Sequence, residues 1–419
     1  MPASESFDFR ETAAARRILI VGGYGTFGSR AAERLAREGG FDIVIAGRDR
    51  ARADEAARAL QRMAAPASRI SGARLDAASA TAADLLELGV GIVINASGPF
   101  QAQSYALAEA AIAAHAHYVD LADARAFVTQ IGTLDNAARA AGVLVVSGAS
   151  SVPGLSSAIV RHLTRGVGGA VARQKKRNTG PRPADDESEL SRAGITREIV
   201  TPEVLDIAIS PGNSFDPGLA TTQSILGYVG RPLRMLIDGQ WRNVHGWQGS
   251  TRHAFPRIGT RLLGYADVPD LDLFPERYPS LRTVRFRAGV EVAAFHLGMW
   301  AISWAVRAGI VRAPERVAGT LLAIKRRLAF LGGDRGGMMV RISGRDPAGA
   351  LRTLSFDLEA SSGHGPYIPA MASVILATKL ARGEITLRGA LACFDLFTLD
   401  EFAAAVADLD IMWGVREGT

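Results

Sequence analysis

The stretch RILIVGGYGTFGSRAAERLARE, residues 17–38, decides the fold. It passes from an apolar run through a glycine-rich turn into an amphipathic helical pattern. Gly23, Gly25 and Gly28 stand in the register G-x-G-x-x-G, in which the first glycine makes a tight turn, the second lets a pyrophosphate approach the backbone, and the third lets the helix pack closely on the strand. The helix offers backbone N–H groups and the positive end of its dipole, and Thr26 can add a hydroxyl. The stretch predicts a dinucleotide-binding turn, with a purely structural turn as the alternative.

The same alternation of apolar runs and helical patterns continues to about residue 150. The runs are rich in Val, Ile and Leu and almost continuous, which is typical of parallel strands buried on both faces. They lie at residues 17–22, 41–47, 91–97, 117–122 and 142–148. We therefore expect an α/β fold whose first part, residues 14–150, is a doubly wound parallel sheet of the Rossmann type.

The pattern changes in the second part of the chain. A charged, proline-bearing stretch at 173–194 is typical of an inserted loop, and segments 203–210 and 282–289 have strand patterns. Segments 337–344 and 352–360 are expected to form a hairpin. We expect an α+β domain with a mostly antiparallel sheet over residues 151–362, followed by a helical tail over 363–419.

The end of the second predicted strand indicates which dinucleotide binds. Arg48 lies 20 residues beyond Gly28, where the adenosine ribose of such a cofactor is expected. A guanidinium suits a 2′-phosphate through charge-assisted hydrogen bonds, so Arg48 predicts NADP. Asp49 leaves NAD open, because a carboxylate facing the ribose would accept from its 2′-hydroxyl. Asp76, after a third strand-like run, could accept from the adenine amino group or cap a helix.

A sharp turn follows the strand pattern that ends at Asn95. Ser97, Gly98, Pro99 and Phe100 lead from it into a helix, and this turn is expected beside the ribose and the nicotinamide. The next predicted strand, 117–122, carries polar residues that we expect on the same edge of the sheet. They are His117, Tyr118, Asp120 and Asp123.

At these motifs the sequence resembles the saccharopine dehydrogenase-like family of NADP-binding oxidoreductases, in a bacterial branch. The matching pieces are VGGYGTFG, AGRD, VINASGPFQ, HYVDLAD and SSVPGLSSAIV, within the first 165 or so residues. The resemblance implies a Rossmann domain, a second domain used for dimerisation and substrate binding, and C-terminal helices that return to the first domain. It also implies a nicotinamide cofactor, usually NADP, held by Gly23, Gly25, Thr26, Phe27, Gly28 and Arg48, with Asn95 to Phe100 near the ribose.

The family includes enzymes that reduce imines formed between an amine and a carbonyl compound. The second half of this chain lacks a clear counterpart of the loop with which amino-acid-using members bind a substrate carboxylate, so saccharopine is not the expected substrate. We expect an NADP-dependent oxidoreductase acting on a small-molecule imine or amine, as a homodimer. The alternatives are an enoyl reductase of a lipid-like substrate and a non-catalytic dinucleotide-binding sensor or assembly protein.

Hydride transfer needs a proton donor or acceptor near the nicotinamide. Tyr118, His117 and Asp123 are candidates on the predicted edge, and His364 stands between two glycines in an expected loop. Packing or solvated roles remain open for each of them. Further candidates in the second domain are His245, His253 and Tyr367, with Arg252 and Arg287 for a substrate carboxylate and Trp241, Trp247 and Phe255 for an apolar pocket.

Composition excludes several classes of protein. The net charge of +6 is spread along the chain rather than gathered on one motif, so no nucleic-acid partner is expected. No metal site is expected, because His115 and His117 have no third ligand. The single cysteine, Cys393, has no base partner in its predicted helix, and with an N-terminus that lacks an apolar core it favours a cytoplasmic location.

One apolar stretch has no assigned role. Residues 292–306 contain 15 residues without an acid or an arginine, which is too short for a membrane span of about 20 residues. We expect a buried or subunit-interface helix there, and peripheral membrane contact stays open.

Overall fold

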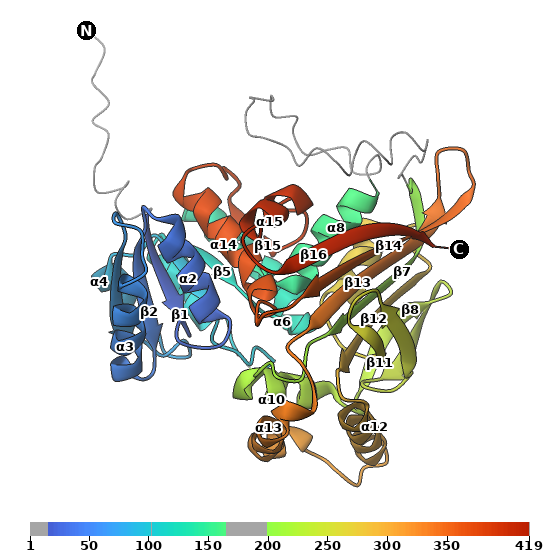
Figure 1. The fold of residues 1–419 in the computed structure, drawn as a ribbon. Helices are drawn as coiled ribbons and strands as arrows, with labels where there is room; N and C mark the ends of the chain where they lie inside the picture. The colour runs from blue at the N-terminus through green and yellow to red at the C-terminus, as the bar shows by residue number, and fades with distance from the viewer. Residues whose placement is uncertain (1–15, 102, 165–198, 419) are drawn as a thin grey trace.

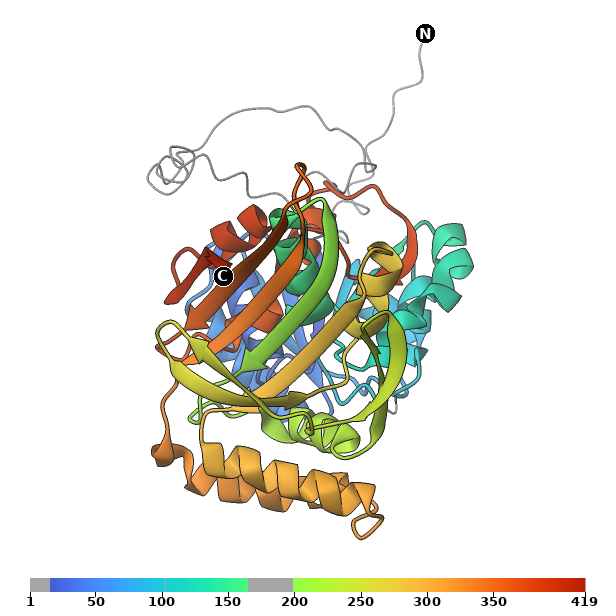
Figure 2. The same ribbon diagram turned by 90° about the vertical axis from the view of Figure 1, so that its right-hand side faces the viewer.

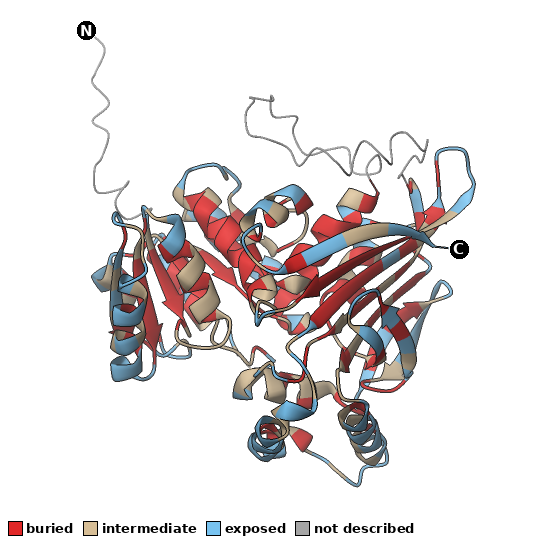
Figure 3. Cartoon of the chain, in the orientation of Figure 1, coloured by how far each residue is buried: buried red, intermediate tan, exposed pale blue. Residues whose placement is uncertain are grey.

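The computed structural model describes residues 16–101, 103–164 and 199–418 (Figure 1). Two sheets stand at either side of a helical layer, and one apolar core cluster runs through both of them. Figure 3 shows this core as continuous buried segments along the strands and along helix α14 (Tyr367–Ala381). The charged stretch 173–194 that was expected to be an inserted loop lies outside the described residues.

The first sheet is the predicted doubly wound parallel sheet. Its order, β15-β6-β5-β4-β1-β2-β3, reverses direction between β1 and β4, and every neighbouring pair is parallel. The expected runs form strands because their β-branched and leucine side chains are buried on both faces. The strands are β1 (Arg17–Val21), β2 (Asp42–Gly47), β3 (Arg69–Arg74), β4 (Ile92–Asn95), β5 (His117–Asp120), β6 (Leu144–Ser147) and β15 (Gly389–Ala392).

Helices cover both faces of this sheet. The core on one face includes side chains of the second, third and fourteenth helices, and the core on the other face includes those of the fourth, fifth and seventh. The helices of this part are α2 (Gly28–Glu38), α3 (Arg50–Gln61), α4 (Ala82–Leu88), α5 (Ala106–Ala113), α6 (Arg125–Thr129), α7 (Asp135–Ala140) and α8 (Ser156–Leu163), with short turns at Ile131–Leu134 and Ser151–Leu155.

The second sheet is mostly antiparallel, and Figure 2 shows it facing the viewer. The expected hairpin is confirmed as β13 paired with β14, while β7 and β12 form a parallel pair. The main path is β10 (Thr251–Phe255), β11 (Gly259–Tyr265), β12 (Thr283–Val290), β7 (Thr201–Ser210), β13 (Gly336–Arg345), β14 (Leu351–Ala360) and β16 (Ile411–Gly418), with β8 (Pro232–Ile237) and β9 (Gln240–His245) attached at β12. Its helices are α10 (Gly218–Tyr228), α11 (Asp270–Arg277), α12 (Ala293–Arg307) and α13 (Ala318–Arg327), with short turns at Pro314–Val317 and Ala329–Leu331.

The expectation of a purely helical tail is wrong. After α14 the chain adds β15 to the edge of the first sheet beside β6, then forms α15 (Leu399–Ala405), and ends as β16 beside β14 of the second sheet. Cys393 follows β15 and is fully buried, and burial raises the pKa of its thiol. Edge strands recruit distant segments because their unpaired backbone groups need partners, a requirement that local sequence patterns do not reveal.

The apolar stretch 292–306 forms α12, and the expectation of a buried helix is wrong within this chain. Leu297, Trp300 and Trp304 are 54%, 40% and 45% exposed, and only His296 and Ser303 of this helix are buried. None of the described helices has the length and apolar character that crossing a membrane requires.

Candidate dinucleotide-binding site

The carboxyl ends of β1 and β4 are the topological switch point of the first sheet, and we call the region between the loops that follow these two strands the crevice. The connections after these two neighbouring strands lead to helices on opposite faces, and ligands of doubly wound sheets bind at such a point. The loops approach each other closely: a Cβ on Gly22 would lie 2.8 Å from the carbonyl oxygen of Ala96. The crevice thus lies where the sequence analysis placed the dinucleotide.

The glycine turn has the geometry of a phosphate cradle. Gly22 adopts a φ of 78°, which favours glycine, and its N–H donates to the carbonyl of Ala46 at 2.8 Å. A Cβ on Gly28 would lie 2.3 Å from the carbonyl oxygen of Gly22, so only glycine lets α2 begin this close to the strand. Among the described residues, none accepts a hydrogen bond from the N–H of Thr26 or Phe27. These donors at the start of α2 fit a diphosphate.

Arg48 is exposed at the bend after β2, whereas the carboxylate of the next residue, Asp49, points to the start of α3. Asp49 caps α3, because its Oδ1 accepts from the N–H of Arg52 at 3.1 Å. The ring of Tyr24, which the sequence analysis missed, lies beneath the guanidinium of Arg52 at 4.7 Å, and its hydroxyl accepts from the N–H of Asp49 at 3.1 Å. Arg50 pairs with Asp54 at 2.9 Å. The turn and the end of β2 therefore form one surface that bears arginines.

Asp76 lies after β3 and is exposed. Its Oδ1 accepts from the N–H of Ala78 at 3.1 Å, which closes a local turn. The alternative of a helix cap is wrong, because Thr81 caps α4 through the N–H of Asp84.

Asn95 holds the turn that follows β4 in place. Its Oδ1 accepts from the N–H and the hydroxyl of Ser97 at 3.0 and 2.5 Å, and its Nδ2 donates to the hydroxyl of Tyr118 at 3.0 Å. Asn95 is buried, and Phe100 is buried against Phe127 with ring centroids 5.3 Å apart. The half-buried residues of the turn, which border the crevice, are Ala96, Ser97, Gly98 and Pro99.

His117 does not lie at the expected edge of the sheet. It is the first residue of β5 and pairs in register with Ile92, the first residue of β4, so it lies at the amino ends of the strands. Its Nδ1 accepts from the N–H of Leu144 at 2.9 Å, and burial lowers its pKa to about 4, with the charge of Arg388 adding to the effect. Tyr118 is 1% exposed, so its side chain supports Asn95 from within the core.

Asp123 follows β5 at the carboxyl ends of the strands, and a residue of the second domain bonds to it there. The hydroxyl of Ser224 on α10 donates to its Oδ2 at 2.9 Å, and the Nε2 of Gln101 lies 3.4 Å from its Oδ1 and also donates to Ser224. Burial raises the pKa of Asp123, and the bond from Ser224 opposes that shift. Ser224 and Gln101 were missed because they are 101 and 22 positions away from Asp123 in the chain.

The segment that leads into α10 also contacts the glycine turn. The hydroxyl of Thr26 donates to the carbonyl of Asp216 at 3.4 Å, and the rings of Phe27 and Phe215 lie 6.2 Å apart. Ala220 lies 3.7 Å from the place of a Cβ on Gly98. The second domain therefore adjoins both loops of the crevice, and a ligand between these loops would meet α10.

Residues 18–146 match the family model described as the saccharopine dehydrogenase NADP binding domain. The first domain is therefore similar to the saccharopine dehydrogenase NADP binding domain. The match covers the glycine turn, Arg48 and the Asn95 turn, and it supports an NAD(P)-dependent oxidoreductase. A search of curated protein sequences finds no match.

One solved structure extends the likeness of fold beyond residues 18–146. An apo, histidine-tagged saccharopine dehydrogenase (L-Glu forming) from Saccharomyces cerevisiae aligns over 96% of this chain and 100% of that chain, with a TM-score of 0.62 and 14% identity. A short-chain type dehydrogenase/reductase from Mycobacterium ulcerans aligns over 32% of this chain and 66% of that chain, with a TM-score of 0.24 and 15% identity. The yeast protein therefore shares the arrangement of both sheets.

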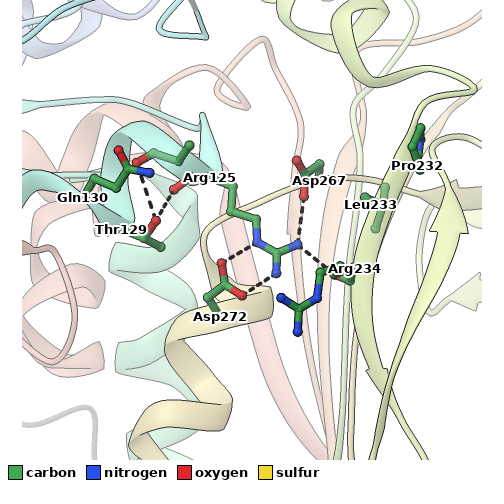
Figure 4. A pocket seen from close by; sticks show the side chains of 9 residues that line it. Arg125, Thr129, Gln130, Pro232, Leu233, Arg234, Asp267 and Asp272 are labelled. Carbon is green, nitrogen blue, oxygen red and sulfur yellow. Dashed lines mark hydrogen bonds and ion pairs between the residues drawn. The ribbon is translucent and has the colours of Figure 1, made fainter.

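A pocket of about 350 Å³ lies between α6 of the first domain and β8 of the second domain. Arg125 on α6 reaches across it to Asp272, to Asp267 at 3.1 Å and to the carbonyl of Arg234 at 2.8 Å (Figure 4). Charges of both signs line this pocket, and those of Arg125, Asp267 and Asp272 are paired with one another.

Several of the remaining candidates have structural partners. His364 accepts from the N–H of Asp410 at 2.9 Å, and the hydroxyl of Tyr367 donates to Glu33 of α2 at 2.8 Å. The buried His253 lies 3.3 Å from Asp357 in the second sheet. Trp247 is buried, which is the packing role that the sequence left open, whereas Trp241 is exposed and stacks with Arg234. No group of three or more potential metal ligands occurs in the part of the chain that the structure describes.

Proposed function

We propose that this protein is an NADP-dependent oxidoreductase that transfers a hydride between the nicotinamide and a small-molecule imine or amine. The observation that supports NADP as the cofactor is the contrast between Arg48 and Asp49, two neighbouring residues at the end of β2. Arg48 is exposed beside the glycine turn, while the carboxylate of Asp49 is bonded to the N–H of Arg52. A guanidinium at this position favours the 2′-phosphate of NADP. A carboxylate that already accepts from a backbone N–H does not favour the 2′-hydroxyl of NAD.

The bound cofactor would supply the hydride, and the residues of the chain would orient it and manage a proton. The N–H groups of Thr26 and Phe27 would hold the diphosphate, and the turn at Ser97 and Gly98 would border the ribose. When an imine is reduced, the hydride adds to carbon and one proton adds to nitrogen. We assign that proton to Asp123, because it stands on the rim of the crevice and burial raises its pKa, which favours the protonated form that a proton donor needs.

Polar groups near Asp123 support this class of substrate. Ser224 and Gln101 bond to Asp123, and Arg125, two positions further along the chain, lines a pocket together with Asp267 and Asp272. Charged walls suit an amine or an imine that carries further polar groups. The aromatic pair Phe27–Phe215 beside the glycine turn favours the second candidate, enoyl reduction of a lipid-like substrate.

The proposal is tested by binding and by isotope transfer. Calorimetric titration with NADPH and NADH should give tighter binding of NADPH. NADPH deuterated at nicotinamide C4 should then pass its label to a metabolite of a cell extract, and mass spectrometry of that metabolite separates an amine from a saturated acyl product. Failure to bind either cofactor would overturn the oxidoreductase proposal, and binding without label transfer would favour a sensor. The expected homodimer is checked by light scattering.

A further inference from the structure

One face of α12 is exposed and mostly apolar, and the guanidinium of Arg307, the last residue of the helix, lies over the ring of Trp304 at 5.0 Å. Leu297, Trp300 and Trp304 are separated by three or four positions, so they lie on one side of the helix. Exposed small residues of α12, Ala293, Ala294, Gly298 and Ala301, add no charge to the helix surface, and no acidic or basic residue other than His296, which is buried, occurs over 292–306. A soluble helix normally presents polar residues to water, so this face needs an explanation.

The apolar exposure continues into the segment after α12. Eight of the sixteen exposed large apolar side chains among the described residues fall within residues 297–331. Both α12 and α13 stand at the same end of the molecule in two perpendicular views, and both are largely exposed (Figures 1, 2 and 3). We name these exposed side chains the α12–α13 surface: Leu297, Trp300, Trp304, Ile310, Val317, Ile324, Phe330 and Leu331.

The same segment is strongly basic. Residues 292–331 contain one acid, Glu315, which pairs with Arg231 at 3.1 Å. They contain six bases, Arg307, Arg312, Arg316, Lys325, Arg326 and Arg327. Arg312, Arg316 and Arg327 are exposed, and no ion pair to them is found within the described part of the chain. The apolar surface is therefore accompanied by exposed arginines for which the described residues provide no ion-pair partner.

We propose that the α12–α13 surface docks on the anionic surface of a lipid membrane. Tryptophan side chains favour the boundary between headgroups and acyl chains, and arginines are attracted to anionic headgroups. A short helix with an apolar face and flanking cations lies in that boundary without spanning the bilayer. A second copy of the chain is disfavoured as the partner, because a two-fold contact would bring the bases of one protomer toward those of the other.

Vesicle flotation tests the proposal on the full chain. Wild-type protein should float with phosphatidylcholine vesicles that contain phosphatidylglycerol, and should float much less with phosphatidylcholine alone. The variant Trp300→Ser/Trp304→Ser should bind the mixed vesicles at least tenfold more weakly. Trp241→Ser is the matched control, because Trp241 is 42% exposed but lies on β9 of the second sheet. It should bind as the wild type does.

Charge variants keep the test independent of how the tryptophan variant folds. Arg312→Gln/Arg316→Gln should weaken binding to the mixed vesicles by about 30-fold, and added salt should weaken the wild type in the same direction. The proposal is overturned if the wild type does not float with anionic vesicles, if neither double variant loses binding, or if light scattering shows that Trp300→Ser/Trp304→Ser only splits a dimer. None of these results depends on the identity of the cofactor or substrate.

Discussion

The hydroxyl of Ser224 donates a hydrogen bond of 2.9 Å to Oδ2 of Asp123, and this bond joins α10 of the second domain to the rim of the NADP-binding domain. Each residue alone is an ordinary polar group at the end of a strand or within a helix. Together they place a carboxylate with a raised pKa beside the crevice, where a proton would be needed. The candidate acid is thus completed by two segments that are far apart in the sequence.

Asp123→Asn should lower kcat/KM for reduction by about a hundredfold or more, since a positioned acid contributes about that much. The protonated carboxyl is the donor, so the wild-type rate of reduction should fall as the pH rises through the raised pKa of Asp123. Because the bond from Ser224 lowers that pKa, Ser224→Ala should move the fall to higher pH. A pH–rate profile checks both results, with the exposed Glu87→Gln as control. A wild-type profile in Asp123→Asn would contradict the assignment.

Arg48→Ala should weaken NADPH binding by about ten- to hundredfold and leave NADH binding nearly unchanged, because the lost contact is a charge-assisted bond to the 2′-phosphate. Arg58→Ala, which removes an exposed arginine in the last turn of α3, is the matched control. Titration calorimetry measures both affinities. A loss of NADH binding in Asp49→Ala, with no effect of Arg48→Ala, would instead make Asp49 the ribose ligand.

Gly28→Ala should abolish measurable cofactor binding and lower stability by about 1–3 kcal/mol, because its Cβ would meet the backbone carbonyl of Gly22 at 2.3 Å. The backbone of the turn would have to shift, and the N–H groups of Thr26 and Phe27 would move with it. Gly132→Ala is the control, since a Cβ there meets nothing within 4 Å. Thermal melting and NADPH titration measure the stability and the affinity of both variants. Equal stability and equal affinity of the two variants would contradict the tight turn.

Asp270 should make the protein less stable as the pH rises from about 4 to 7. It is 0% exposed, its Oδ1 accepts from the hydroxyl of Ser156 at 2.5 Å, and burial raises its pKa to about 7. In that window the folded state keeps a proton that the unfolded state has lost, so the free energy of unfolding falls by up to about 4 kcal/mol and then levels off.

Asp270→Asn removes this titration and should therefore gain stability relative to the wild type between pH 5 and pH 8. Urea unfolding at both pH values measures the difference between the two proteins. A difference that stays constant with pH would show that Asp270 is ionised in the fold. The comparison between variants cancels the contribution of Asp120, whose pKa burial raises to about 6.

Local patterns were sufficient for much of the first domain. The glycine turn, the parallel strands and the position of Arg48 depend on residues close together in the sequence, and strands buried on both faces leave an apolar signature. The error at His117 had a different origin. The predicted strand 117–122 begins at His117, so His117 belongs at the amino end of the strand, and only residues that follow the strand reach its carboxyl end.

The sequence by itself determined the doubly wound sheet, the tight glycine turn and the hairpin β13–β14, because each depends on short-range periodicity and on glycine at constrained positions. Only the tertiary structure decided that Asp49 caps α3, that Ser224 reaches Asp123, that the tail supplies β15 and β16, and that α12 stays exposed. These outcomes depend on which distant segments meet. Hydrogen-bond satisfaction and burial across such segments are properties of the folded chain as a whole.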